Sequence, residues 1–108
     1  MSLIYRQLWI RGAKGRRKVL ALFDTGASES FIRSDVAYHI GVPLKLLMPF
    51  RVEFGRGAAR VKEQVEAVIT IDGFRIRWSY SLIPKMTEEL VIGTDFLQRY
   101  RITLDPAK

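Results

Sequence analysis

The chain has 108 residues, 48% of them apolar, which is enough for one hydrophobic core and leaves little room for a second. It has no cysteine, so disulfides and thiolate chemistry are excluded, and its single histidine, His39, is too few for a histidine-based metal cluster. The formal net charge of +7 would suit an anionic partner, but solvated loops and strand faces explain such charge more simply.

The sequence gives no sign of a membrane or export segment. Its longest apolar run, Val19–Phe23, is far shorter than the roughly 20 residues that a membrane-spanning helix needs. The first ten residues lack the basic start and apolar centre of a signal peptide. We therefore expect no membrane span, and a cytoplasmic location if this sequence is the full-length protein.

In the first part of the chain, the pattern of apolar residues predicts β structure. Leu8 and Ile10 alternate with Gln7, Trp9 and Arg11, and residues 17–23 form a second strand-like stretch. The Gly-Ala-Lys-Gly loop between them, residues 12–15, predicts that the two stretches form a hairpin. Val19–Phe23 is continuously apolar, as expected of a strand buried on both faces.

The centre of the chain predicts two further hairpins. Residues 50–54 alternate, residues 55–59 are a flexible turn of glycine, arginine and alanine, and residues 61–71 read as a long strand. Asp72-Gly73 is a strong two-residue hairpin signal. Four apolar residues of the next strand should then share one face: Phe74, Ile76, Trp78 and Tyr80.

Two short helices are expected among these strands. Ser34 is a suitable N-cap for the first, which should end before Gly41. The second should be capped by Thr94 or Asp95 and run through Tyr100. With no repeat and no linker, residues 1–108 are expected to form one β-rich domain.

The most informative stretch is the run Leu22-Phe23-Asp24-Thr25-Gly26-Ala27-Ser28. A carboxylate directly after an apolar strand is unusual, because an unpaired charge is costly to bury. Gly26 permits close approach by another chain, and it permits a backbone conformation that is closed to other residues. Asp-Thr-Gly alone can be an ordinary turn, but the apolar segment with a glycine at residues 89–97 can pack beneath it. The pattern describes an acid displayed at the tip of a rigid strand.

These residues together resemble the retroviral-type, or retropepsin-like, aspartic proteases, and within them the non-viral cellular and microbial branch. The similarity rests on Leu22–Ser28, Phe31-Ile32, Val52–Gly55 and Val91–Leu97. It implies an all-β, mainly antiparallel fold, namely a closed acid-protease barrel with one short C-terminal helix, which assembles as a homodimer.

The resemblance also implies a role for each matching position. Asp24 would be the catalytic aspartate. Four residues would complete its active-site loop: Thr25, which would hydrogen-bond across the dimer axis, Gly26, which would contact the substrate backbone, Ala27 and Ser28. Five residues would form the flap over the peptide: Gly55, Arg56, Gly57, Ala58 and Ala59. Four residues would support the loop from beneath: Ile92, Gly93, Thr94 and Asp95.

The expected site departs from the viral members in two respects: one ion pair is missing, and the flap lacks their usual run of glycines at its tip. Viral members often pair an acid after Asp-Thr-Gly-Ala with an arginine after the helix glycine, and here Ser28 and Thr94 occupy those positions, so that ion pair is absent. The apolar lining of the substrate pockets is harder to assign. We expect it to come from residues such as Ile32, Val52, Ile83 and Ile92.

The predicted function is therefore that of an aspartic endopeptidase. The chain holds one Asp-Thr-Gly, so the second carboxylate would come from a symmetric partner. Two neighbouring carboxylates share one proton, the ionised one takes a proton from the attacking water, and the other protonates the peptide carbonyl. The substrate would be an extended peptide or protein, and no metal or organic cofactor is implied.

Two other functions are compatible with the sequence. A catalytically weak retropepsin-like module, which binds peptides or dimerises without appreciable cleavage, would use the same motif. A basic nucleic-acid-binding β-domain would account for the net charge. We do not expect the latter, because no aromatic residues are interleaved with the basic loops.

Overall fold

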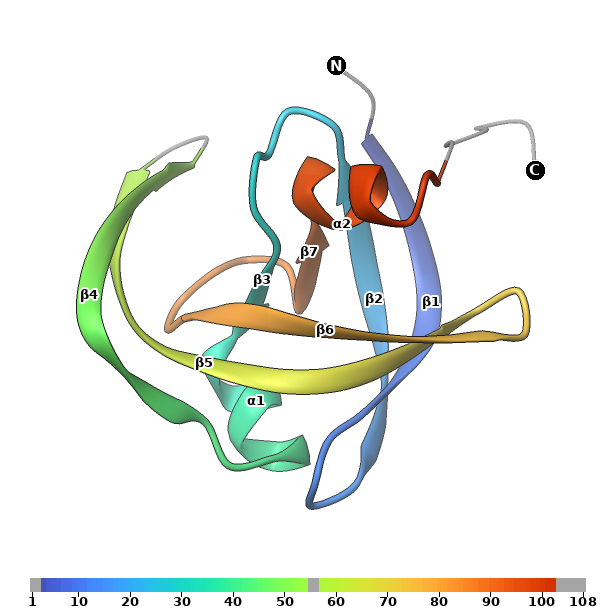
Figure 1. Cartoon of the computed structure of the whole chain (residues 1–108), viewed down its shortest axis with the longest axis horizontal. Helices are drawn as coiled ribbons and strands as arrows, with labels where there is room; N and C mark the ends of the chain where they lie inside the picture. Colours follow the sequence, from blue (N-terminus) through green and yellow to red (C-terminus); the bar gives the residue numbers. More distant parts are fainter. Residues whose placement is uncertain (1–2, 55–56, 103–108) are drawn as a thin grey trace.

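Seven strands and two short helices make up the described part of the chain, residues 3–54 and 57–102 of a computed structural model (Figure 1). In chain order these elements are β1 (Leu3–Arg11), β2 (Arg16–Asp24), β3 (Phe31–Arg33), α1 (Ser34–Ile40), β4 (Leu44–Phe54), β5 (Gly57–Ile71), β6 (Phe74–Ile83), β7 (Leu90–Ile92) and α2 (Thr94–Arg99).

Six of these strands close into a barrel. Their order is β1-β2-β7-β3-β6-β5, and the ring closes where Trp9–Arg11 of β1 pairs with Val68–Thr70 of β5. Among the described strands β4 pairs with β5 alone, so it extends from the barrel as one arm of a long hairpin. Five of the seven pairings are antiparallel, and β2–β7 and β3–β6 are parallel. The predicted mainly antiparallel, closed barrel is confirmed.

The barrel interior forms the main hydrophobic core. The six barrel strands and both helices contribute to it, and α1 and α2 cover its ends through residues such as Ile40 and Phe96. Along β2 the inward side chains are Val19, Ala21 and Phe23, whereas Leu20 is 43% exposed. The expectation that all of Val19–Phe23 would be buried is therefore wrong at one position, since strand alternation directs Leu20 to the outside.

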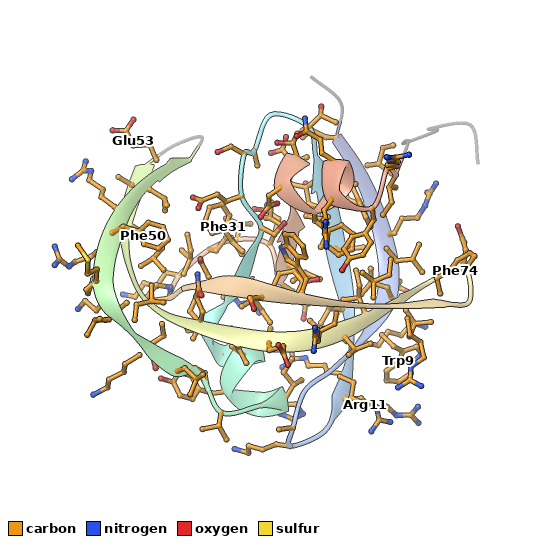
Figure 2. All side chains as sticks on the ribbon, in the orientation of Figure 1. Trp9, Arg11, Phe31, Phe50, Glu53 and Phe74 are labelled. Atoms are coloured by element: carbon orange, nitrogen blue, oxygen red, sulfur yellow. The ribbon has the colours of Figure 1, made fainter. Side chains whose placement is uncertain are left out.

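A second cluster of buried residues lies between the barrel and the β4–β5 hairpin. It contains seven buried side chains: Leu22, Phe31, Val52, Val61, Ile83, Met86 and Val91. Phe50 packs against it from β4, and Figure 2 shows the Phe50 ring on the side of β4 that faces Phe31. This packing fixes the position of the hairpin relative to β2, β3 and β7.

The two helices start without the side-chain caps that the sequence predicts. The N-cap positions are Arg33 for α1 and Gly93 for α2, and neither helix has a capping hydrogen bond from a side chain. Arg33 instead donates from Nε to Oδ1 of Asp35, in the first turn, over 2.6 Å, and this hydrogen bond lowers the pKa of Asp35. In the described residues no helix is long and apolar enough to cross a membrane.

Of the two hairpins in the central region, one has the predicted turn and the other has a shorter one. Asp72 and Gly73 have φ angles of 48° and 82°, which gives the two-residue turn that the sequence predicts. The turn predicted at residues 55–59 is shorter, because β5 already begins at Gly57, which pairs with Phe54. Gly55 and Arg56 lie outside the described residues. Phe74 is 71% exposed, since it lies next to the turn and beyond the barrel wall (Figure 2).

Substitution of Gly73 by alanine should destabilise the fold by about 1–2 kcal/mol, because an L side chain is strained at positive φ. Gly15→Ala is the matched control, since a Cβ at Gly15 would meet no atom within 4 Å. That control should leave stability unchanged or raise it by about 0.4–1 kcal/mol. Urea unfolding of both variants measures the difference, and equal midpoints would contradict the turn geometry.

Candidate active site

Asp24 is the last residue of β2, where the strand leaves the barrel wall. Its carboxylate is partly exposed, and Oδ1 accepts a hydrogen bond from the backbone N–H of Gly26 over 2.8 Å. The backbone N–H of Ala27 donates to the carbonyl oxygen of Asp24 over 3.1 Å. These two contacts fold the chain into a tight turn directly after the strand, so the local backbone orients the Asp24 carboxylate.

The loop that follows Asp24 arches over the end of β7. In the sheet β7 lies between β2 and β3, and the loop connects those two strands. β7 pairs in parallel with Ala21–Phe23 of β2 and antiparallel with Phe31-Ile32 of β3. One short strand therefore holds both the entry and the exit of the loop, and the residues after β7 lie directly beneath it.

Three hydrogen bonds tie the loop to the start of α2. The backbone N–H of Thr94 donates to the carbonyl oxygen of Ala27 over 2.8 Å, and the Thr94 hydroxyl donates to the same oxygen over 3.2 Å. The Ser30 hydroxyl donates to Oδ1 of Asp95 over 2.7 Å. Ser30 also accepts a hydrogen bond from the backbone N–H of Gly93 over 2.9 Å. Since Ser30 is buried, its hydrogen bond with the Gly93 N–H is shielded from water and holds the loop firmly.

Gly93 is required here for space rather than for conformation. Its φ of −96° is open to any residue. A Cβ at this position, however, would lie 2.2 Å from the carbonyl oxygen of Glu29 and 2.8 Å from that of Ala27. Only a residue without a side chain lets the loop lie this close to the β7–α2 junction. The structure thus places Gly93, Thr94 and Asp95 beneath the loop.

The Asp24 carboxylate opens into a cleft of about 550 Å³. The floor comes from the ends of β2, β3 and β7, and the walls come from the first residues of β5 and the loop that precedes β7. Eleven residues line it: Leu22, Asp24, Ala27, Phe31, Gly57, Ala58, Lys85, Met86, Thr87, Glu88 and Val91. Figure 1 shows the free end of the β4–β5 hairpin at the same end of the molecule as the β2–β3 loop and α2.

Of the flap residues expected from the sequence, Gly57 and Ala58 line this cleft directly. Ala59 is partly buried and packs against the second cluster, below the cleft. Thr25, Gly26 and Ser28 are exposed on the loop itself. The hairpin therefore supplies one wall of the space in front of Asp24.

The expectation for the apolar lining is wrong. Ile32 and Ile92 are fully buried in the barrel core, and Val52 and Ile83 pack inside the second cluster. The apolar lining comes from the adjacent residues Phe31 and Val91 and from two further residues, Leu22 and Met86. Because side chains alternate along a strand, Phe31 and Val91 point to the cleft while their neighbours Ile32 and Ile92 point to the core.

Three contributions to the site were missed in the sequence. Ser30 carries the buried hydrogen bonds described above, and no spacing or motif marks it. Glu89 accepts a hydrogen bond from the backbone N–H of Leu20 over 3.0 Å and forms an ion pair with Arg17 at 3.3 Å. Its carboxylate thus binds β2 just beyond the pairing with the short strand β7. Residues 85–88 bring the charges of Lys85 and Glu88 into the cleft.

The described residues contain no group of three His, Cys, Asp or Glu side chains arranged to hold a metal ion. The polar residues that line the cleft are Asp24, Glu88, Thr87 and Lys85, so carboxylates, a hydroxyl, an ammonium and backbone groups are available there. An Asp-Thr-Gly loop fixed at the rim of a closed mixed β-barrel defines a protein of the aspartic-protease class.

The comparisons with known proteins agree with this class. The family model described as "gag-polyprotein putative aspartyl protease" matches residues 10–99, and the chain belongs to this retropepsin-like family. Among curated proteins, no sequence matches the chain significantly.

Two solved structures share the fold. The EIAV protease, complexed with the inhibitor HBY-793, superposes with a TM-score of 0.67 at 18% identity and covers 96% of this chain and 93% of its own. The retroviral protease-like domain of Ddi1 from Leishmania major superposes with a TM-score of 0.71 at 22% identity, with 97% and 82% covered. At these identities the likeness establishes the retropepsin barrel.

Gly93→Ala should destabilise the protein by about 3 kcal/mol, because the new methyl group would displace the backbone of Glu29 and with it the Asp24 loop. Gly57→Ala is the matched control in the cleft wall, where a Cβ would meet nothing within 4 Å. Chemical denaturation would show the loss for the first variant only. A Gly93 variant within about 0.5 kcal/mol of wild type would contradict the close approach.

Proposed function

We propose that the protein is an aspartic endopeptidase that hydrolyses peptide bonds in extended polypeptides and acts as a homodimer, with one Asp24 from each chain. The observation that carries the proposal is the Asp24 carboxylate itself. It is held by the Gly26 N–H at the tip of a core strand, and it opens into a cleft of about 550 Å³. Residues 1–108 would constitute one domain, which is half of the active enzyme.

The second carboxylate is assigned to a partner chain because this chain offers no equivalent of Asp24. The sequence contains one Asp-Thr-Gly. Glu88 also lines the cleft, but it comes from a different loop, without the hydrogen-bonded support described for Asp24. Leu3, directly opposite Asp24 in the β1–β2 pairing, is 54% exposed. An exposed apolar residue beside the carboxylate favours an interface at this end, where Thr25 would contact the partner's loop.

The catalytic cycle follows from a pair of carboxylates that share one proton. Two such groups a few ångströms apart do not both ionise at intermediate pH. The ionised Asp24 takes a proton from a water molecule, whose oxygen attacks the peptide carbonyl carbon, while the protonated Asp24 gives its proton to the carbonyl oxygen. The resulting tetrahedral species loses the amine after a proton is returned to the peptide nitrogen. No cofactor is needed.

The shape of the cleft supports an extended substrate. One wall is the start of β5 at Gly57 and Ala58, where backbone groups are accessible, and the other is the loop of residues 85–88. A peptide between them could bind as an added strand, with alternate side chains directed to the apolar floor. Lys85 and Glu88 would then form ion pairs with charged side chains of the substrate.

Digestion of a peptide library at several pH values, with and without a pepstatin-type inhibitor, tests the proposal. Inhibitor-sensitive cleavage is expected. Binding of the inhibitor without any cleavage would instead favour the alternative of a retropepsin-like module that binds peptides or dimerises.

Peptidase activity should be highest at acidic pH and fall as the pH rises above neutrality. The reason is that loss of the shared proton removes the group that protonates the carbonyl oxygen. Circular dichroism over the same pH range would show whether the fold persists while the rate changes. A rate that climbs steadily into the alkaline range would rule out this mechanism.

Mixing of wild-type chains with Asp24→Asn chains should reveal a shared site. Asparagine keeps the size of aspartate but cannot supply the carboxylate, so mixed dimers should form and be inactive. With equal amounts and random pairing, about a quarter of the dimers keep both aspartates, whereas independent sites would keep about half of the activity.

Asp72→Asn is the control for this mixing experiment, because it makes the same chemical change in an exposed turn where Asn is equally suited to positive φ. Its mixtures with wild type should keep full activity. Activity near a half in the Asp24 mixture, with chain exchange shown independently, would mean that each chain works alone.

A further inference from the structure

Basic side chains gather on the outer face of the barrel, away from the cleft. The strand register places them in two rows across β2, β1, β5 and β6. The first row consists of Lys18, Trp9, Thr70 and Arg75. The second row consists of Arg16, Arg11, Val68 and Arg77. Figure 2 shows Trp9 and Arg11 together on the outside of the barrel. We call these eight residues the basic face.

Most of the charge on the basic face is not neutralised within the chain. Arg77 forms a long ion pair with Glu66 at 3.9 Å. In the described part of the chain, no carboxylate forms an ion pair with Arg11, Arg16, Lys18 or Arg75. Arg11 and Arg16 even stand directly opposite each other in the β1–β2 pairing, an arrangement of like charges that costs stability. The fold itself gains nothing from this pair.

The basic face is also hollowed and contains an aromatic ring. A depression of about 380 Å³ is lined by Trp9, Arg11, Arg16, Val68, Thr70 and Arg75. The Arg16 guanidinium lies 4.7 Å from the centre of the Trp9 ring, and 45% of the Trp9 surface remains exposed. The sequence shows no aromatic residue among the basic loops, yet in the folded barrel Trp9 lies among three basic side chains of the depression, Arg11, Arg16 and Arg75.

We propose that the basic face is a binding site for single-stranded nucleic acid. The guanidinium and ammonium groups would contact successive phosphates, and a base would enter the depression against Trp9 and the stacked Arg16 side chain. Lys18 and Asp24 are six positions apart along β2, about 20 Å, so the site is distinct from the cleft and does not depend on the proposed proteolysis.

The shape of the site favours a single strand over the other anionic partners. In a duplex the bases stay stacked inside the helix, so none can enter the depression. An anionic membrane would be met best by apolar side chains that protrude among the charges. Here the Trp9 ring lines the depression, while the exposed Phe74 protrudes beside Arg75 at the β5–β6 turn, so vesicle binding is measured alongside oligonucleotide binding. If the nucleic acid bound through charge alone, any pair of exposed arginines would contribute equally to affinity. Substitution of two different arginine pairs distinguishes this case from a defined site.

The test uses the full chain and a fluorescent single-stranded oligonucleotide of mixed sequence, about 12 nucleotides long. Fluorescence anisotropy should show binding that weakens as salt rises. In the double variant Arg11→Gln/Arg16→Gln, the slope of log affinity against log salt should fall by about 1.4, since each phosphate contact contributes about 0.7. Trp9→Leu should weaken binding about tenfold through loss of stacking.

The matched control is Arg51→Gln/Arg60→Gln, which removes the same charge from another pair of exposed arginines that face each other across β4 and β5. Thermal melts would confirm that all variants fold. The control and Asp24→Asn should bind like wild type. Equal losses in both double variants, equal binding of a duplex, or binding of phosphatidylserine vesicles without the oligonucleotide would overturn the proposal, as would no binding at all.

Discussion

The close approach of Gly93 to the backbone of Glu29 is the contact on which the rest of the site depends. β7 is only three residues long, yet it holds the end of β2 on one side and the start of β3 on the other. The chain that follows it must therefore pass directly under the loop that joins those strands. Without a side chain at Gly93, the Thr94 and Ser30 hydrogen bonds reach their partners, and the loop gains fixed polar contacts in place of water. The position of Asp24 thus follows from a packing constraint at the other end of the sequence.

The start of α2 is held from two sides. On the polar side, Asp95 accepts hydrogen bonds from Ser30 and from the backbone N–H of Phe96. On the apolar side, the Phe96 ring meets Trp78 edge-on at 5.6 Å, which packs the helix against β6. Burial raises the pKa of Tyr80, and the charge of Asp95 adds to this effect, so the phenol stays protonated. α2 therefore connects the loop to the barrel core through both polar and apolar contacts.

The sequence was sufficient for the parts of the structure that local chemistry decides. Alternation of apolar and polar residues predicted most of the strands. Asp72-Gly73 predicted its turn, because that turn needs two consecutive residues with positive φ and few residue types adopt positive φ. The apolar run before Asp24 predicted an acid at the end of a strand. It was insufficient where the outcome depends on which strands meet. Phe31 and Ile32 are equally apolar, and only the pairing of β3 with β6 and β7 decides which faces the cleft. Ser30 and Glu89 likewise acquire their roles from neighbours more than fifty residues away in the chain.

The same argument explains why charge was hard to interpret in the linear sequence. Arg16 and Arg75 are distant in sequence and belong to different hairpins, but closure of the barrel through the β1–β5 pairing brings them to one depression with Trp9. The nine residues of β2 contribute to three parts of the molecule. Val19, Ala21 and Phe23 point into the core, whereas Arg16 and Lys18 face outward near the β1–β2 hairpin. Asp24 ends the strand at the cleft. Because a strand keeps its two faces and its two ends apart, the basic side chains and the carboxylate do not neutralise each other. A barrel this small can therefore carry an acidic cleft and a cationic surface at the same time.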